Sequence, residues 1–92
     1  MNKRQPPTPL QLHLWKVLDE MTARNRRPPT IRELKEETGS SSTSTTIYQL
    51  MRGIDAGRVV KITPEFGAQR AYAPAWWAKM VEENLDKYYV SQ

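Results

Sequence analysis

The fold is decided by residues 28–63, which read PPTIRELKEETGSSSTSTTIYQLMRGIDAGRVVKIT. Thr30 and Glu33 match a capping box, in which each side chain accepts the backbone N–H of the other residue, so we expect a helix to begin there. Gly39 ends this helix after about two turns, because glycine readily adopts the left-handed conformation that closes a helix. The stretch therefore opens with a short helix.

The residues after Gly39 predict a turn and then a longer helix. Residues 40–46 are all serine or threonine, whose hydroxyls compete with helical hydrogen bonds and favour turns and helix starts. Apolar side chains then recur at helical spacing, which predicts a helix over residues 43–56 that ends at Gly57. Four of them form a stripe that we expect to face the core: Ile47, Leu50, Met51 and Ile54.

Gly53 stands inside this predicted helix. A glycine in a helix interior costs about 1 kcal/mol relative to alanine. We infer that another backbone or an aromatic ring, such as that of Trp15, approaches the helix closely at this position.

Upstream, residues 8–24 are predicted to form a helix. Thr8 and Gln11 match a second capping box, and Pro9 suits the first helical position. One face carries a regular apolar stripe of Leu10, Leu14, Val17, Leu18 and Met21. Leu12 and Trp15 fall on other sides of this helix, so each needs a cover from elsewhere.

Downstream, a β-hairpin and a fourth helix are predicted. Residues 59–63 and 69–73 have the β-branched, alternating pattern of paired strands, and residues 64–68 resemble a turn. After Pro74 the fourth helix has an apolar stripe of Trp77, Val81, Leu85 and Tyr88.

These elements predict a fold that is mainly α with a small β-hairpin. The order helix, short helix, turn, helix, hairpin is that of a winged helix-turn-helix. We expect three parts in the 92-residue chain: a flexible N-terminal arm at 1–7, the winged helix-turn-helix domain at 8–74, and a C-terminal helix at 75–92 for packing or dimerisation.

Composition favours a nucleic-acid ligand over catalysis. The net charge is +4, and residues 1–74 hold twelve of the basic and seven of the acidic side chains, which suits a polyanion. The chain has no cysteine and a single histidine, His13, so the usual metal ligands and nucleophiles are missing. We expect no enzymatic activity, no metal and no cofactor. No apolar run could cross a membrane, and we expect a cytoplasmic protein.

The motif also resembles the N-terminal DNA-binding domain of the LexA repressor. The resemblance is carried by Pro28-Pro29-Thr30-Ile31-Arg32-Glu33-Leu34, by Gly39 and by Gly57-Arg58-Val59, and it spans residues 8–73. It implies a bacterial or phage-encoded repressor that binds double-stranded DNA as a homodimer. LexA continues into a self-cleaving peptidase domain, and we do not expect that activity here. The sequence leaves open whether a small-molecule effector binds.

The third helix is predicted to read bases in the major groove, where a recognition helix presents its outward side chains. Six residues point away from the predicted apolar stripe or lie at the helix start: Ser42, Ser44, Thr45, Tyr48, Gln49 and Arg52. Glutamine suits adenine and arginine suits guanine, whereas serine and threonine discriminate weakly. The resemblance implies a contact at Ile47 as well, but the periodicity puts Ile47 inward, and we follow the periodicity.

Six further residues are predicted to contact the DNA backbone or to lie on the wing: Arg26, Arg27, Thr30, Arg32, Lys61 and Arg70. Such contacts add affinity and salt dependence without specifying sequence. Lys61 and Arg70 flank the hairpin turn, where a wing reaches phosphates or the minor groove.

An alternative is a winged-helix adaptor that binds a protein partner through the aromatic C-terminal helix. The residues proposed for this partner surface, or for a dimer interface, are Leu12, Trp15, Trp76, Trp77, Val81, Leu85 and Tyr88. Salt dependence separates the alternatives, because phosphate contacts weaken steeply with salt and apolar docking does not.

Overall fold

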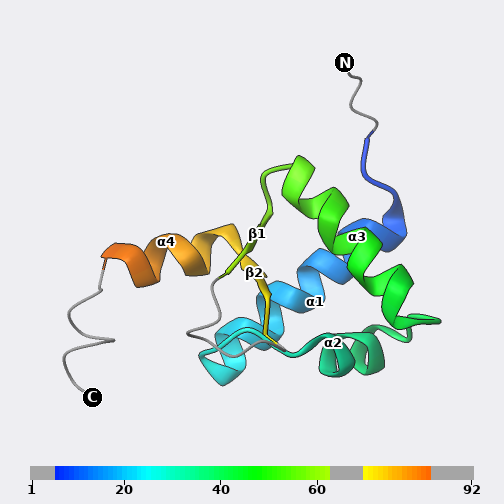
Figure 1. Ribbon diagram of the computed structural model, residues 1–92, viewed down its shortest axis with the longest axis horizontal. Coiled ribbons are helices and arrows are strands. Elements are labelled where there is room, and N and C mark those ends of the chain that lie inside the picture. The colour runs from blue at the N-terminus through cyan, green and yellow to red at the C-terminus, as the bar shows by residue number, and fades with distance from the viewer. Residues whose placement is uncertain (1–5, 63–69, 84–92) are drawn as a thin grey trace.

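The computed structural model describes residues 6–62 and 70–83. This part of the chain contains four helices and two strands (Figure 1). In chain order they are α1 (Pro9–Asn25), α2 (Ile31–Thr38), α3 (Thr43–Asp55), β1 (Val59–Lys61), β2 (Tyr72–Pro74) and α4 (Ala75–Glu83). The prediction of a mainly α fold with a small antiparallel strand pair is confirmed.

Both predicted capping boxes are present. The Thr8 side chain accepts the Gln11 N–H and the Gln11 side chain accepts the Thr8 N–H, at 3.1 and 3.0 Å. Thr30 and Glu33 are paired in the same way, at 3.0 and 2.9 Å. Local sequence therefore sets the starts of α1 and α2.

Two left-handed residues end the first two helices. Gly39 closes α2 with a φ of 73°. Arg26 closes α1 with a φ of 61°. Among the described residues it is the only one other than glycine with a positive φ. An L-residue is strained in this conformation, whereas glycine is not.

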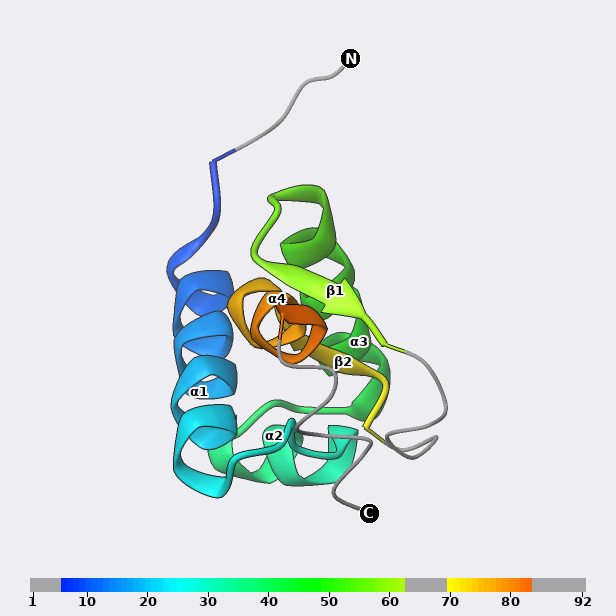
Figure 2. The same ribbon diagram turned by 90° about the vertical axis from the view of Figure 1, so that its left-hand side faces the viewer.

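The two strands pair antiparallel, with Val59 opposite Pro74 and Lys61 opposite Tyr72. The second strand thus lies slightly later than the predicted 69–73, and the predicted turn at 64–68 lies outside the described residues. In Figure 1 the pair separates α4 from α3, and Figure 2 shows α1 and α2 on the other sides of the core. Helix α1 contacts α2, α3 and β2, while α4 contacts both strands.

The main core lies between α1, α2, α3 and β1. Its buried side chains are Leu14, Trp15, Val17, Leu18, Met21, Leu34, Leu50 and Val59. A smaller cluster under α4 contains Ala73, Trp77 and Val81. The predicted stripe of α1 is largely confirmed, except that Leu10 at its first turn is half exposed.

The predicted core stripe of α3 is wrong in part. Met51 and Ile54 are exposed and Ile47 is half-buried, so Leu50 alone of the four is fully buried. The buried side of the helix consists of Thr46, Gln49, Leu50 and Gly53. Helix α3 is therefore rotated relative to the stripe that its apolar residues suggest.

The ring of Trp15 explains this rotation. A Cβ atom added to Gly53 would lie 2.8 Å from Trp15 Nε1 and 2.5 Å from Val59 Cγ2, closer than real Cβ contacts. Trp15 Nε1 also donates a hydrogen bond to the Gln49 carbonyl at 3.0 Å. The inferred approach of Trp15 to Gly53 is confirmed. Because only glycine leaves room for the ring, Gly53 must face inward, which turns Met51 outward.

A Gly53→Ala substitution is expected to lower the free energy of unfolding by about 1–2 kcal/mol. The added methyl group overpacks the contact with Trp15 and Val59, and this outweighs the higher helix propensity of alanine. Urea denaturation followed by circular dichroism measures the change. Exposed Met51→Ala is the control and should change stability by about 0.5 kcal/mol or less. A Gly53→Ala chain as stable as the wild type would contradict the close contact.

Candidate nucleic-acid interface

Three predicted contact residues lie at the N-terminal end of α3. Ser42 is the N-cap, and its Oγ accepts the Thr45 N–H at 3.1 Å and donates to Thr45 Oγ1 at 3.0 Å. The Thr45 hydroxyl keeps its own hydrogen for another acceptor. Ser44 is exposed. This end of the helix therefore presents hydroxyl groups whose positions are set by the cap.

The exposed face of α3 continues from Ser44 through Tyr48 to Met51. These residues are four and three positions apart, so they share one side of the helix. Tyr48 is 56 % and Met51 53 % exposed. Ile54, one turn further, and half-buried Ile47 border the same side. We call Ser44, Ile47, Tyr48 and Met51 the outer face of α3.

Met51 was missed by the sequence reasoning, although Gly53 carried a usable signal. A residue two positions away on an α-helix lies about 200° round the axis. If Gly53 faces a tryptophan ring, Met51 must lie on the opposite side of the helix. Ile47 is half-buried. This agrees better with the resemblance, which implies that Ile47 contacts DNA, than with the periodicity, which places Ile47 in the core.

The prediction that Gln49 points away from the core is wrong. Its relative exposure is 9 %, and among the described residues its Oε1 has no hydrogen-bond partner. The side chain lies on the buried side of α3 because Trp15 packs there and bonds to the Gln49 carbonyl. Gln49 is therefore not available to a base in this structure.

Arg52 lies at the border of the outer face. Its side chain is one-third exposed, and its Nη1 lies 3.7 Å from Asp55 Oδ2 on the next turn. This ion pair competes with any other anion for the guanidinium group. Arg52 is thus partly accessible but is paired within α3.

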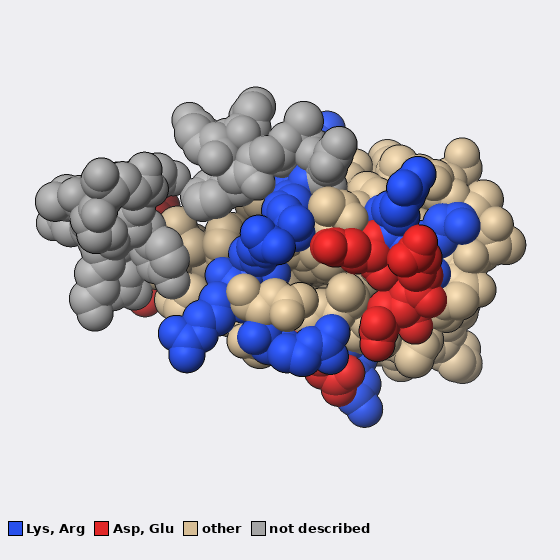
Figure 3. All heavy atoms as spheres, turned by 90° about the horizontal axis from the view of Figure 1, so that it is seen from below, with Lys and Arg blue, Asp and Glu red and all other residues tan. Residues whose placement is uncertain are grey.

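The predicted cations before and within α2 are exposed. Arg26 follows α1, Arg27 lies in the connection, and Arg32 is in the first turn of α2. Figure 3 shows Lys and Arg side chains gathered in a band on the α2 side of the molecule, beside a cluster of Asp and Glu. Helix α2 itself carries exposed Glu36 and Glu37. A polyanion on this side would have to lie over the basic band and avoid the acidic cluster.

Thr30, a predicted phosphate contact, is half-buried and its hydroxyl accepts the Glu33 N–H in the α2 cap. The hydroxyl hydrogen remains to be donated elsewhere. In this structure the Thr30 hydroxyl therefore caps α2, and only its hydrogen is left for a contact with phosphate.

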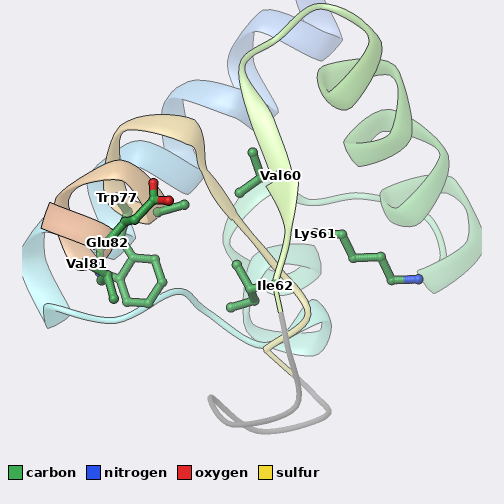
Figure 4. A pocket seen from close by; sticks show the side chains of 7 residues that line it. Val60, Lys61, Ile62, Trp77, Val81 and Glu82 are labelled. Carbon is green, nitrogen blue, oxygen red and sulfur yellow. The ribbon is translucent and has the colours of Figure 1, made fainter. Parts of the chain in front are cut away.

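Lys61 on β1 is exposed and points away from α4, on the side of the strand where α3 lies (Figure 4). Its neighbours Val60 and Ile62 point the other way, as strand alternation requires. They line a shallow, mostly apolar hollow of about 270 Å³ between β1 and α4, together with Trp77, Ala78, Val81 and Glu82.

Among residues 6–62 and 70–83 no group of side chains could hold a metal ion.

Arg70 is not the free cation that the wing prediction assumed. Its Nη1 donates to the Pro28 carbonyl at 2.7 Å and lies 3.3 Å from Glu33 Oε1. The hydrogen bond from the Thr30 backbone N–H, with the charge of Arg70, holds the pKa of Glu33 below its ordinary value. Arg70 thus ties the residues before β2 to the start of α2.

Three of the five described members of the predicted partner surface are buried within the chain. Trp15, at 2 % exposure, lies in the main core, and Trp77 and Val81 pack against the strand pair. The prediction that these three form an external surface is wrong, because the chain supplies their cover itself. Two other predicted members, Leu85 and Tyr88, lie outside the described residues.

Leu12 and Trp76 are the members that remain exposed. Trp76 Nε1 donates to Asp19 Oδ1 at 3.1 Å, which ties α4 to α1. Asp19 Oδ2 also lies 3.7 Å from Arg58, whose guanidinium group stands 5.6 Å from the centre of the Trp15 ring. Trp76 is therefore partly engaged within the chain.

Comparison with family models, curated proteins and solved structures finds no match to this chain. None of the described helices is long and apolar enough to cross a membrane.

Proposed function

We propose that the chain is a sequence-specific regulator, acting as a repressor, that binds double-stranded DNA as a winged helix-turn-helix. In this proposal α2 and α3 are the helix-turn-helix, α3 enters the major groove, and β1 and β2 belong to the wing. The observation that carries it is the outer face of α3, of which Ser44, Tyr48 and Met51 are exposed, together with exposed cations before α2, on α2 and on β1.

The major groove of DNA admits one α-helix, whose outward side chains then meet base edges. The outer face of α3 offers a hydroxyl at Ser44 and the large side chains of Tyr48 and Met51 for such contacts. Arg27 and Arg32 beside the start of α2, and Lys61 on β1, are exposed and suit the phosphates on either side. Binding alone would block an operator, so no catalytic group is needed.

A homodimer is the second part of the proposal. Two copies related by a two-fold axis would bind half-sites about 34 Å apart, one turn of DNA, and the operator would be palindromic. Leu12 and Trp76 are exposed apolar side chains that a dimer contact could use.

The test is a fluorescence anisotropy titration of the whole chain against random-sequence duplex DNA at about 50 and 200 mM salt. We expect salt-dependent binding that weakens when Tyr48 is replaced by alanine. The control is Leu10→Ala, which removes an exposed apolar side chain from α1 that lies outside the proposed dimer contact. Absence of binding at low salt, or equal loss with both substitutions, would count against the proposed recognition face.

A protein-binding adaptor is the second candidate. Exposed Met51 and Ile54 on α3 favour it, since apolar side chains that no element covers suit a protein partner. The buried positions of Trp77 and Val81 remove the route through the aromatic stripe of α4. Binding of a protein partner whose affinity does not change with salt, together with no binding of duplex DNA, would favour this candidate.

A further inference from the structure

The side chains that read guanine and adenine are withdrawn from the outer face of α3. Arginine and lysine read guanine, and asparagine and glutamine read adenine, each through two hydrogen bonds in the major groove. The candidates in α3 are Gln49, which is buried, and Arg52, which is paired with Asp55. The outer face itself carries hydroxyl and apolar groups.

We propose that α3 recognises thymine, through contact of the outer face with the thymine 5-methyl group. The inference rests on the proposed DNA-binding function and names its substrate class. Thymine is the base whose major-groove edge presents a methyl group, and apolar side chains are its recognised partners. Met51 and the ring of Tyr48 supply apolar surface of this kind.

The hydroxyls add a polar component to the same contact. Thymine also presents the O4 acceptor in the major groove. Ser44 and Tyr48 are exposed on the same side of α3 as Met51, and each hydroxyl can donate one hydrogen bond. The outer face thus offers a donor next to apolar surface, as the thymine edge requires.

Charge favours DNA over an apolar groove of a protein as the occupant of this face. Arg32 on α2 and Lys61 on β1 are exposed on the elements that flank α3 in the chain, Arg27 is exposed in the connection before α2, and the net charge is +4. These cations suit phosphates, whereas a protein groove for Met51 and Ile54 would gain little from them.

The first measurement is a selection of bound sequences from random duplex DNA by the whole chain. The selected duplex is then prepared again with uracil in place of thymine, which removes the 5-methyl groups and leaves the hydrogen-bonding edges unchanged. We expect thymine to be enriched at fixed positions, and affinity to fall about fourfold for each contacted methyl group, equivalent to ~0.8 kcal/mol per buried carbon.

Protein variants locate the contact on α3. In Met51→Ser the penalty for uracil should shrink, because the side chain that meets the methyl group is gone. The matched control is Leu10→Ser, whose residue is exposed to a similar degree, 49 %, but lies on α1 and outside the proposed dimer contact. That control should keep the full uracil penalty. Circular dichroism checks that both variants are folded.

The outcomes separate this inference from the proposed function. Selected sites without thymine, equal affinity for the uracil and thymine duplexes, or an unchanged penalty in Met51→Ser would overturn thymine recognition while salt-dependent binding still supported the DNA-binding proposal. No binding to any duplex at low salt would overturn both.

Discussion

Replacement of Trp15 with alanine is expected to lower the free energy of unfolding by about 3–5 kcal/mol, the usual cost of removing a buried aromatic side chain. Trp15 is almost fully buried, and its ring fills the space above Gly53. Its N–H also satisfies the Gln49 carbonyl, which would lose its partner in the variant. A domain of this size has a total stability of about 5–10 kcal/mol, so a large part would be lost.

Urea denaturation followed by circular dichroism measures this effect. Trp76→Ala is the matched control, because it removes the same side chain from a half-exposed position on α4, and it should cost about 1 kcal/mol or less. Trp15→Phe should lie between the two, since it keeps part of the ring volume but loses the hydrogen bond to Gln49. Equal costs for Trp15→Ala and Trp76→Ala would mean that Trp15 does not hold α3 in place.

The double substitution Arg27→Ala/Arg32→Ala is expected to weaken binding to duplex DNA by about tenfold to thirtyfold at low salt. Each arginine that neutralises a phosphate releases a counterion, so the slope of log affinity against log salt should fall by about 0.9 per arginine. Sequence preference should be unchanged, because phosphate contacts carry no base information. Anisotropy titration at several salt concentrations gives both quantities.

The charge-matched control is Lys16→Ala/Lys79→Ala. It also removes two exposed cations, from α1 and α4, and therefore changes the net charge equally. We expect a small change in affinity and nearly the wild-type salt slope. If both double variants lost the same affinity, net charge would account for binding and the basic residues near α2 would have no special role.

The parts of the fold that depend on neighbouring residues were predictable from the sequence. The capping boxes at Thr8 and Thr30 need partners three residues away, and both formed as expected. Gly39 and Gly57 both have positive φ, as their predicted roles at the helix ends require. The contact between Trp15 and Gly53 was inferred because a glycine inside a helix needs a reason.

The apolar periodicity of α3 does not give the rotation of the helix, and the one signal for it within α3 is Gly53. Periodicity assumes that apolar side chains face inward, but here the space is taken by a ring from α1. Thr46 can replace an apolar residue in the core because its hydroxyl donates to the Ser42 carbonyl at 3.0 Å. The same assumption places Gln49 on the outward side of α3, whereas the structure buries it.

Long-range partners account for the other corrections. Arg70 bonds to Pro28, 42 residues earlier in the chain, and no local pattern around Arg70 indicates that partner. The stripe of Trp77 and Val81 correctly predicted an apolar side of α4. Periodicity shows that such a side needs a cover, but it does not tell whether the cover comes from the same chain.

The left-handed conformation of Arg26 has a consequence for engineering this chain. Glycine would occupy that position without strain and would gain about 1 kcal/mol of stability. The same change would delete an exposed cation from the surface that we propose faces phosphate. In the proposed DNA complex, a variant optimised for heat resistance at this residue is therefore expected to lose affinity, because the same side chain would serve binding at a cost to folding.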